Sequence, residues 1–119
     1  MLFQRNMYLM AVSYTHLDVY KRQVLGDMFE MGSFAEEGHR EVGKCASEYA
    51  DILIAVGDDA KFMVDEAIKN NMDKENTYYF KTKEEAIENF ENILQKGDAI
   101  LVKASIGMQL EEVVEFLSK

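Results

Sequence analysis

Hydrophobic residues follow two alternating patterns from residue 24 to the end of the chain. Short runs of apolar, β-branched or aromatic residues, the kind that form buried strands, occupy 24–25, 52–56, 77–80 and 99–102. After each run, apolar residues recur every three or four positions, as on one helix face, over 35–50, 60–68, 82–94 and 110–117. Helical crossovers of this kind join parallel strands and cover both faces of a sheet. The pattern therefore predicts a single α/β domain with a Rossmann-like, doubly wound, mostly parallel sheet of four strand–helix repeats, (βα)4, from residue 24.

Two of these helices carry sequence signals for their first turn. Asp58 or Asp59 precedes the helix over 60–68, where a carboxylate can accept hydrogen bonds from free backbone amides. Thr82 and Glu85 have the spacing of a capping box at the start of the helix over 82–94. We therefore expect Asp58 or Asp59 to cap the first of these helices and Thr82 to cap the second.

Composition and charge narrow the class of protein. The chain has 119 residues, 48% of them hydrophobic, and no proline, which suits one globular domain. Its formal net charge of −9 repels phosphate backbones and anionic lipid head groups, and no apolar run approaches the ~20 residues that span a bilayer. We therefore expect neither nucleic acid nor a membrane as a partner. The single cysteine, Cys45, falls among apolar residues at helical spacing, which predicts a buried thiol and fits a cytoplasmic location.

Residues 1–23 differ in composition from the rest of the chain. They contain three Lys/Arg and one Asp, a formal charge of +2, whereas residues 24–119 contain ten Lys/Arg and 21 Asp/Glu, a formal charge of −11. Residues 8–12 could form a strand, but no turn or cap signal frames them. The tract 13–23 resembles translated adapter or vector sequence. We therefore expect 1–23 to be a non-native segment, leave it out of the fold prediction, and expect 24–119 to be the domain; the alternative is a genuine basic N-terminal arm.

Two segments are candidates for ligand binding, because ligands of doubly wound sheets lie outside the carboxyl ends of the strands. Gly26–Gly32 leaves the first expected strand, holds two acids between two glycines, and precedes a helix that carries His39. Lys103–Met108 leaves the last strand and enters a helix, where Ser105 and the amides near Gly107 could bind an anionic group. From spacing alone, each segment could equally be an ordinary strand-to-helix turn with solvated charges.

The spacing G-x-x-x-x-G-K at 38–44 matches a phosphate-binding loop but lacks its context. The true loop follows a strand and ends in Ser or Thr, whereas here Cys45 holds that place and the helical apolar stripe continues through it. We therefore expect 38–44 to be helical and not to cradle a nucleotide. The sequence also lacks a cluster with zinc-ligand spacing.

Two separated motifs resemble the Mur ligases that add D-alanyl-D-alanine to UDP-muramoyl-tripeptide in peptidoglycan synthesis. The first is V-L-G-D-M-F-E-M-G at 24–32 with H-R-E-V-G at 39–43, where the family has V-L-G-D-M-x-E-L-G and then H-x-x-V-G. The second is L-V-K-A-S-I-G-M at 101–108 with E-E-V-V at 111–114, where the family has L-V-K-G-S-R-G-M and an amphipathic helix. The resemblance covers residues 24–119 and corresponds to the C-terminal domain of such a ligase.

The resemblance implies a part in ATP-driven amide formation, in which a substrate carboxylate becomes an acyl phosphate and an incoming amine displaces phosphate. In the family a preceding central domain carries the phosphate loop, the magnesium site and a catalytic lysine. ATP and Mg²⁺ thus belong to the parent enzyme, and neither a cofactor nor ligase activity is expected for this chain alone. The C-terminal domain closes over the site and positions the nucleotide and the dipeptide. The resemblance assigns substrate binding, but no catalytic or metal-binding role, to Asp27, Met28, Glu30, Gly32, His39, Lys103, Ser105, Gly107 and Met108.

A phosphoacceptor receiver module is the alternative from another class of protein. It shares the chain length, the alternating βα order, an acidic pair at 58–59 and a lysine at the end of a late strand. Receiver modules place a lone aspartate at the end of a central strand and usually a proline after the lysine. Here the third strand ends in Phe80 and Lys81, and Ala104 follows Lys103.

The chain departs from the Mur ligase pattern at two positions of the second motif: Ala104 replaces a glycine and Ile106 replaces a residue that is often basic.

Overall fold

The computed structural model describes residues 7–12, 22–28, 31–94, 100–105 and 111–117. Its strands are β1 (Met7–Val12), β2 (Arg22–Gly26), β3 (Ile52–Val56), β4 (Thr77–Phe80) and β5 (Ile100–Ser105). Its α-helices are α1 (Ala35–Tyr49), α2 (Lys61–Lys69), α3 (Lys83–Ile93) and α4 (Glu111–Leu117). Single 3-10 turns precede α1 and β4, at Gly32–Phe34 and Lys74–Asn76. In the described part of the chain, no helix has the length and apolar character needed to cross a membrane.

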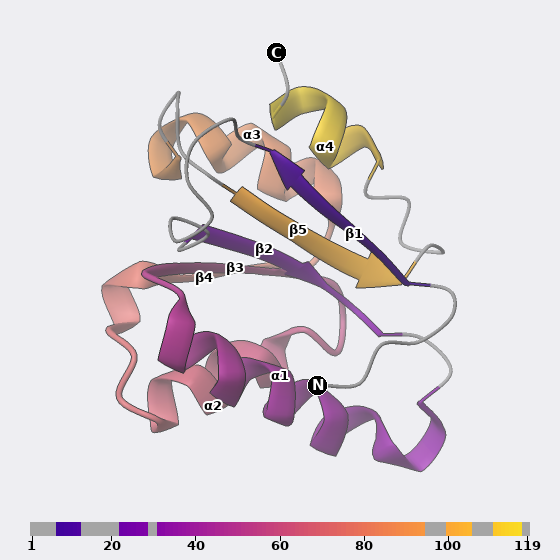
Figure 1. Ribbon diagram of the computed structural model, residues 1–119, viewed down its shortest axis with the longest axis vertical. Helices are drawn as coiled ribbons and strands as arrows, with labels where there is room; N and C mark the ends of the chain where they lie inside the picture. The colour runs from indigo at the N-terminus through magenta and orange to yellow at the C-terminus, as the bar shows by residue number, and fades with distance from the viewer. Residues whose placement is uncertain (1–6, 13–21, 29–30, 95–99, 106–110, 118–119) are drawn as a thin grey trace.

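The five strands form one sheet in the order β1-β5-β2-β3-β4. Strands β5, β2, β3 and β4 run parallel to their neighbours. Counted from β2, the parallel strands lie in the order 4-1-2-3, which is the inner part of a Rossmann sheet. Helices α1 and α2 cover one face and α3 and α4 the other, as Figure 1 shows. The predicted fold class, doubly wound with four strand–helix repeats, is confirmed.

Strand β1 lies where residues 8–12 could form a strand but no turn or cap signal framed them. It runs antiparallel to β5 along its whole length, from Met7 opposite Ser105 to Val12 opposite Ile100. It belongs to the segment 1–23, and β2 itself begins at Arg22, two residues before the expected boundary of the domain. An edge strand is held by backbone hydrogen bonds on one side only, and these do not depend on side-chain type. Its sequence therefore need not show the apolar pattern of a central strand. That residues 1–23 are non-native stays a prediction.

Two apolar layers hold the helices on the sheet. On the α3 and α4 side, side chains of β2, β3 and β5 pack around Phe90, whose ring lies 5.9 Å from that of Phe116. On the other side, Leu25, Leu53 and Ala55 pack against Ala46 of α1 and Met63 of α2. Alternate residues of each central strand thus face opposite layers, as a parallel sheet covered on both faces requires.

Of the two predicted helix caps, the one at α3 is confirmed and the one at α2 is wrong. Thr82 accepts a hydrogen bond from the amide of Glu85, and the Glu85 side chain bonds back to the amide of Thr82, so the capping box at α3 is confirmed. At α2 the N-cap position is Ala60, which has no side-chain cap, so neither Asp58 nor Asp59 caps this helix. The amides just before α2 donate instead to the carboxylate of a residue that follows β2, described below.

Helices α1 and α2 approach each other most closely at Gly43. A Cβ at this position would clash with the backbone of Met63, so the residue must be glycine for the two helices to keep their distance. The segment 38–44 lies inside α1, which confirms that its G-x-x-x-x-G-K spacing is not a phosphate-binding loop. Its second glycine serves helix packing.

We predict that Gly43→Val lowers the free energy of unfolding by about 2 kcal/mol or more, because the added side chain forces α1 away from α2. Gly38→Val is the matched control on the same helix, since a Cβ there would meet the movable end of the Met31 side chain. Urea unfolding followed by circular dichroism measures both. Equal losses in the two variants would contradict a specific helix contact at Gly43.

Candidate functional site

The two motif segments leave the sheet side by side, at the edge formed by the carboxyl ends of its parallel strands. Strands β2 and β5 are parallel neighbours, with Val24 opposite Val102 and Leu25 opposite Lys103, so their carboxyl ends meet. This is also the point where the strand order reverses, because the chain passes from β2 towards β3 on one side and returns to β5 on the other. In doubly wound sheets the ligand crevice lies at such a switch point.

Six of the nine predicted site residues lie in the described part of the chain: Asp27, Met28, Gly32, His39, Lys103 and Ser105. Ser105 is the last residue of β5, and only its backbone position is described. Glu30, Gly107 and Met108 lie outside the described residues. Among the described residues, the buried polar or charged side chains are Asp27, His39 and Lys103, all three predicted from the motifs.

Asp27 links the end of β2 to the first turn of α2. Its Oδ1 accepts hydrogen bonds from the backbone amides of Asp59, at 3.1 Å, and Ala60, at 2.7 Å. These amides belong to the free N-terminus of the helix, where a negative charge also meets the positive end of the helix dipole. Asp27 therefore performs the capping role that the sequence suggested for Asp58 or Asp59.

Gly57 makes room for this carboxylate. It follows β3 with φ of +127°, in the region that favours glycine, and donates a hydrogen bond to the carbonyl of Phe80 at 3.0 Å. A Cβ at Gly57 would clash with the carboxyl group of Asp27. The ends of β2, β3 and β4 are thus fitted together around one side chain.

Burial raises the pKa of the Asp27 carboxyl above its ordinary value of 3.8. The two amide hydrogen bonds, from Asp59 and Ala60, favour the charged form and oppose this rise, and the charge of Asp59 adds to it. Only 6% of the residue is exposed, so water offers little solvation to the charge.

His39 is completely buried on α1 and uses both ring nitrogens within the protein. Its Nδ1 lies 2.6 Å from the carbonyl oxygen of Ala35, which can only accept, so Nδ1 carries the proton. Its Nε2 accepts a hydrogen bond of 2.9 Å from the amide of Met28. The ring is therefore the neutral Nδ1–H tautomer, and the 3.9 Å between Nε2 and the Asp27 carboxylate is a neighbouring contact without an ion pair.

Lys103 is 4% exposed, although lysine is almost never this buried. Because Val102 faces the α3 and α4 layer, Lys103 faces the layer under α1. Burial lowers the pKa of its ammonium group, and the nearby Cys45 opposes that shift. Cys45 is only half-buried, so the expectation of a buried thiol holds in part.

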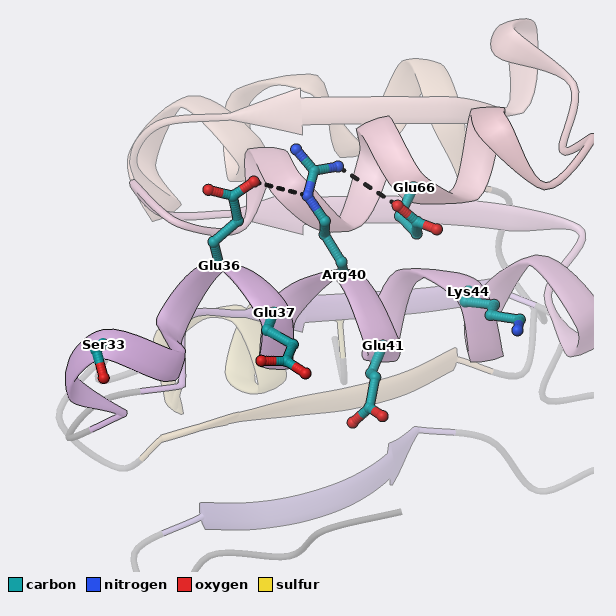
Figure 2. Close-up of a pocket in the computed structure, with 7 residues that line it drawn as sticks. All are labelled: Ser33, Glu36, Glu37, Arg40, Glu41, Lys44 and Glu66. Atoms are coloured by element: carbon teal, nitrogen blue, oxygen red, sulfur yellow. Dashed lines mark hydrogen bonds and ion pairs between the residues drawn. The ribbon is translucent and has the colours of Figure 1, made fainter.

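A shallow groove of about 440 Å³ on the outer side of α1 does not coincide with this edge. It is lined by Ser33, Glu36, Glu37, Arg40, Glu41, Lys44 and Glu66, none of them a predicted site residue. Figure 2 shows Arg40 between Glu36 and Glu66, with hydrogen bonds of 2.9 and 3.4 Å. The Arg40–Glu36 pair is exposed and contributes little to stability, whereas the Arg40–Glu66 pair is partly buried.

Tyr79 of β4 is a residue that the motifs did not point to. Burial raises the pKa of its hydroxyl, and Asp58, Asp27, Glu85 and Asp59 add to the rise in that order. The ring is 38% exposed, so it borders the same acidic edge of the sheet. The sequence offered only its position in a strand as a signal.

The described residues do not form a metal or nucleotide-phosphate site. No group of three or more His, Cys, Asp or Glu among them could hold a metal ion. The one G-x-x-x-x-G-K spacing is inside α1. Chemistry that depends on a bound metal is therefore not assigned to any of these side chains.

The fold and this edge define a Rossmann-like domain whose polar groups converge at the switch point of the sheet. The chain belongs to the Mur ligase family: residues 13–106 match the family model described as "Mur ligase, glutamate ligase domain", the C-terminal domain of these enzymes. A curated relative, UDP-N-acetylmuramoyl-tripeptide–D-alanyl-D-alanine ligase of Bacillus subtilis (strain 168), is 36% identical over 98 residues, which cover 82% of this chain and 21% of the relative.

Two crystal structures of MurF from Acinetobacter baumannii are also similar. The first has a TM-score of 0.67 at 25% identity and covers 83% of this chain and 21% of that protein. The second has a TM-score of 0.67 at 24% identity, covers 82% and 22%, and supports the fold alone. The chain thus spans about a fifth of the length of the relatives it matches.

We predict that Asp27→Ala lowers the free energy of unfolding by about 1–2 kcal/mol, because α2 loses its capping acceptor. Asp27→Asn keeps an oxygen at Oδ1 and should lose less. Asp58→Ala removes an exposed carboxylate nearby and should change stability by less than about 0.5 kcal/mol. A larger loss for Asp58→Ala than for Asp27→Ala in urea unfolding would overturn this assignment of the cap.

The raised pKa of Asp27 predicts the pH dependence of stability. The folded state holds the proton more tightly than the unfolded chain, so this carboxyl stabilises the fold most below its ordinary value of 3.8. That contribution is lost as the pH rises from 3.8 through the raised value. Because Asp27→Asn does not titrate, the stability of the natural chain minus that of the variant should fall with pH across this window. A difference that rises would mean that the amide hydrogen bonds outweigh burial.

Proposed function

We propose that this chain is the substrate- and nucleotide-positioning domain of an ATP-dependent Mur ligase that joins D-alanyl-D-alanine to UDP-muramoyl-tripeptide. The observation that carries the proposal is that the three buried polar or charged side chains of the described residues lie on the motif segments next to the switch point: Asp27 and His39, 3.9 Å apart, and Lys103 on the neighbouring strand β5. Keeping charged or polar groups out of water costs free energy, and such groups gather where a protein binds or positions a ligand. The identity of 36% to a ligase of this specificity supports the choice of substrates.

In this proposal the chain contributes position and not bond-making. We assign Mg²⁺ and most contacts to ATP to the rest of the parent enzyme, in line with the domain organisation that the family resemblance implies. The ends of β2 and β5 present backbone amides and the motif side chains to the reactants as the domain closes. Holding an amine near an acyl phosphate in a productive geometry raises the rate by lowering the entropic cost of the encounter. The parent enzyme is expected to act in the cytoplasm.

A receiver module is a poorer match to the sheet. In a receiver the first strand lies between the second and the third, the order 2-1-3-4-5. Here the third parallel strand, β4, pairs with the second, β3, and the first, β2, pairs with β5. The strand order thus favours the ligase reading.

The proposal is tested with a chimera in which this chain replaces the matching 98-residue segment of the Bacillus subtilis relative. We expect phosphate release from ATP that depends on both UDP-muramoyl-tripeptide and D-alanyl-D-alanine, and no such release from the 119-residue chain alone. In the chimera, Asp27→Ala or Ser105→Ala should lower kcat/KM for the dipeptide about tenfold or more. The exposed Glu91→Ala of α3 is the matched control.

Two results would contradict the proposal. One is a folded chimera, with native circular dichroism, that releases no dipeptide-dependent phosphate. The other is an active chimera in which Asp27→Ala and Ser105→Ala leave the dipeptide KM and kcat unchanged, which would remove the site from the ends of β2 and β5.

A further inference from the structure

His39 carries an inference that goes beyond its place in a motif. The side chain is 0% exposed, and each ring nitrogen already has a partner inside the protein. A neutral imidazole has one donor and one acceptor, so no hydrogen-bonding capacity is left for a substrate. Any effect of His39 on a ligand must therefore pass through the groups that the ring holds.

The groups that it holds lie at opposite ends of the β2–α1 connection. Nδ1–H donates to the carbonyl of Ala35, the first residue of α1, which fixes the plane of the ring. Nε2 accepts from the amide of Met28, two residues beyond the end of β2. The ring thus ties the point where the chain leaves β2 to the start of the next helix.

The same hydrogen bond fixes the neighbouring residue. The amide of Met28 is the peptide group that joins it to Asp27, whose carboxylate is bonded to the amides of Asp59 and Ala60. Asp27 is therefore held on its backbone side by His39 and on its side-chain side by α2. The hydrogen bonds from Met28 to His39 and from Ala60 to Asp27 are both buried. Breaking either would leave a buried amide unpaired, which costs free energy. Together they fix the direction in which the chain leaves the sheet.

We propose that His39 is a positioning residue: as the neutral Nδ1–H tautomer, it sets the direction in which the chain leaves β2, through its acceptor contact with the Met28 amide. The inference rests on the proposed function only for its catalytic consequence, since the end of β2 is where that function places the substrates. Ala35 is the support that orients the ring, and Met28 is the group that is positioned.

Nuclear magnetic resonance of the ¹⁵N-labelled 119-residue chain tests the geometry without any ligand. We expect a scalar coupling across the hydrogen bond between the Met28 amide nitrogen and Nε2 of His39, and nitrogen shifts of an Nδ1–H ring. Absence of the coupling in a folded sample, or a ring protonated on Nε2, would overturn the proposal. This measurement needs no variant, so a folding defect cannot obscure it.

Two substitutions then separate the two ring nitrogens. His39→Gln places an amide group near Nε2 and can still accept from Met28, whereas His39→Asn reaches only the Nδ1 position and can still donate to Ala35. Hydrogen exchange of the Met28 amide should be about fivefold to tenfold faster in His39→Asn than in His39→Gln. If the two variants exchange equally fast, the acceptor contact does not hold this amide and the proposal fails.

The catalytic consequence is measured in the chimera described above. His39→Asn should lower kcat/KM for the dipeptide about tenfold, and His39→Gln should restore it to within about threefold of the natural residue. Equal losses in both variants would show a merely structural role and overturn positioning. A chimera without activity, with the coupling to Met28 present in the chain, would count against the proposed function and leave the positioning contact established.

Discussion

The carboxylate of Asp27 lies where three segments of the chain meet: the end of β2, the end of β3 and the start of α2. Its backbone ends β2, its Oδ1 accepts from Asp59 and Ala60 at the start of α2, and its side chain fills the space that Gly57 leaves open. Moving α2 would strip the acceptor from its amides, and a side chain at residue 57 would displace the carboxylate. The relative positions of β2, β3 and α2 depend on this one small group being buried and bonded.

That arrangement explains why polar groups are buried at one edge of an otherwise apolar domain. The Asp27 carboxylate bonds the start of α2, the His39 imidazole lies on the buried side of α1, and the Lys103 ammonium group faces the layer under α1. Burial raises the pKa of Asp27 and lowers that of Lys103, which favours the neutral form of each. Burying an apolar side chain costs less free energy than burying a polar one, and the layers around Phe90 and Met63 are apolar. The buried polar groups lower the free energy of unfolding but hold their hydrogen-bonding atoms in fixed positions, a combination that is common at ligand-binding sites.

The sequence predicted the repeating units better than the contacts between them. Apolar periodicity located the four parallel strands and their helices because burial on two faces leaves a strong pattern. The local capping box at Thr82 was also readable, since both partners lie three residues apart. The cap of α2 was not, because its acceptor comes from Asp27, 33 residues from Ala60, and nearby aspartates offered a simpler but wrong solution. Similarly, the motifs located His39 but could not reveal that its ring is turned inward.

The pairing of β1 with β5 has a consequence for how the domain behaves among other proteins. The contact is a ladder of backbone groups, and such a ladder tolerates a segment whose composition differs from that of its partner. Without β1, strand β5 (Ile100–Ser105) would stay paired with β2 on one side and would leave the backbone groups of its other side free. Free backbone groups at a sheet edge can pair with strands of other proteins, and β1 moves that open edge from β5 to itself.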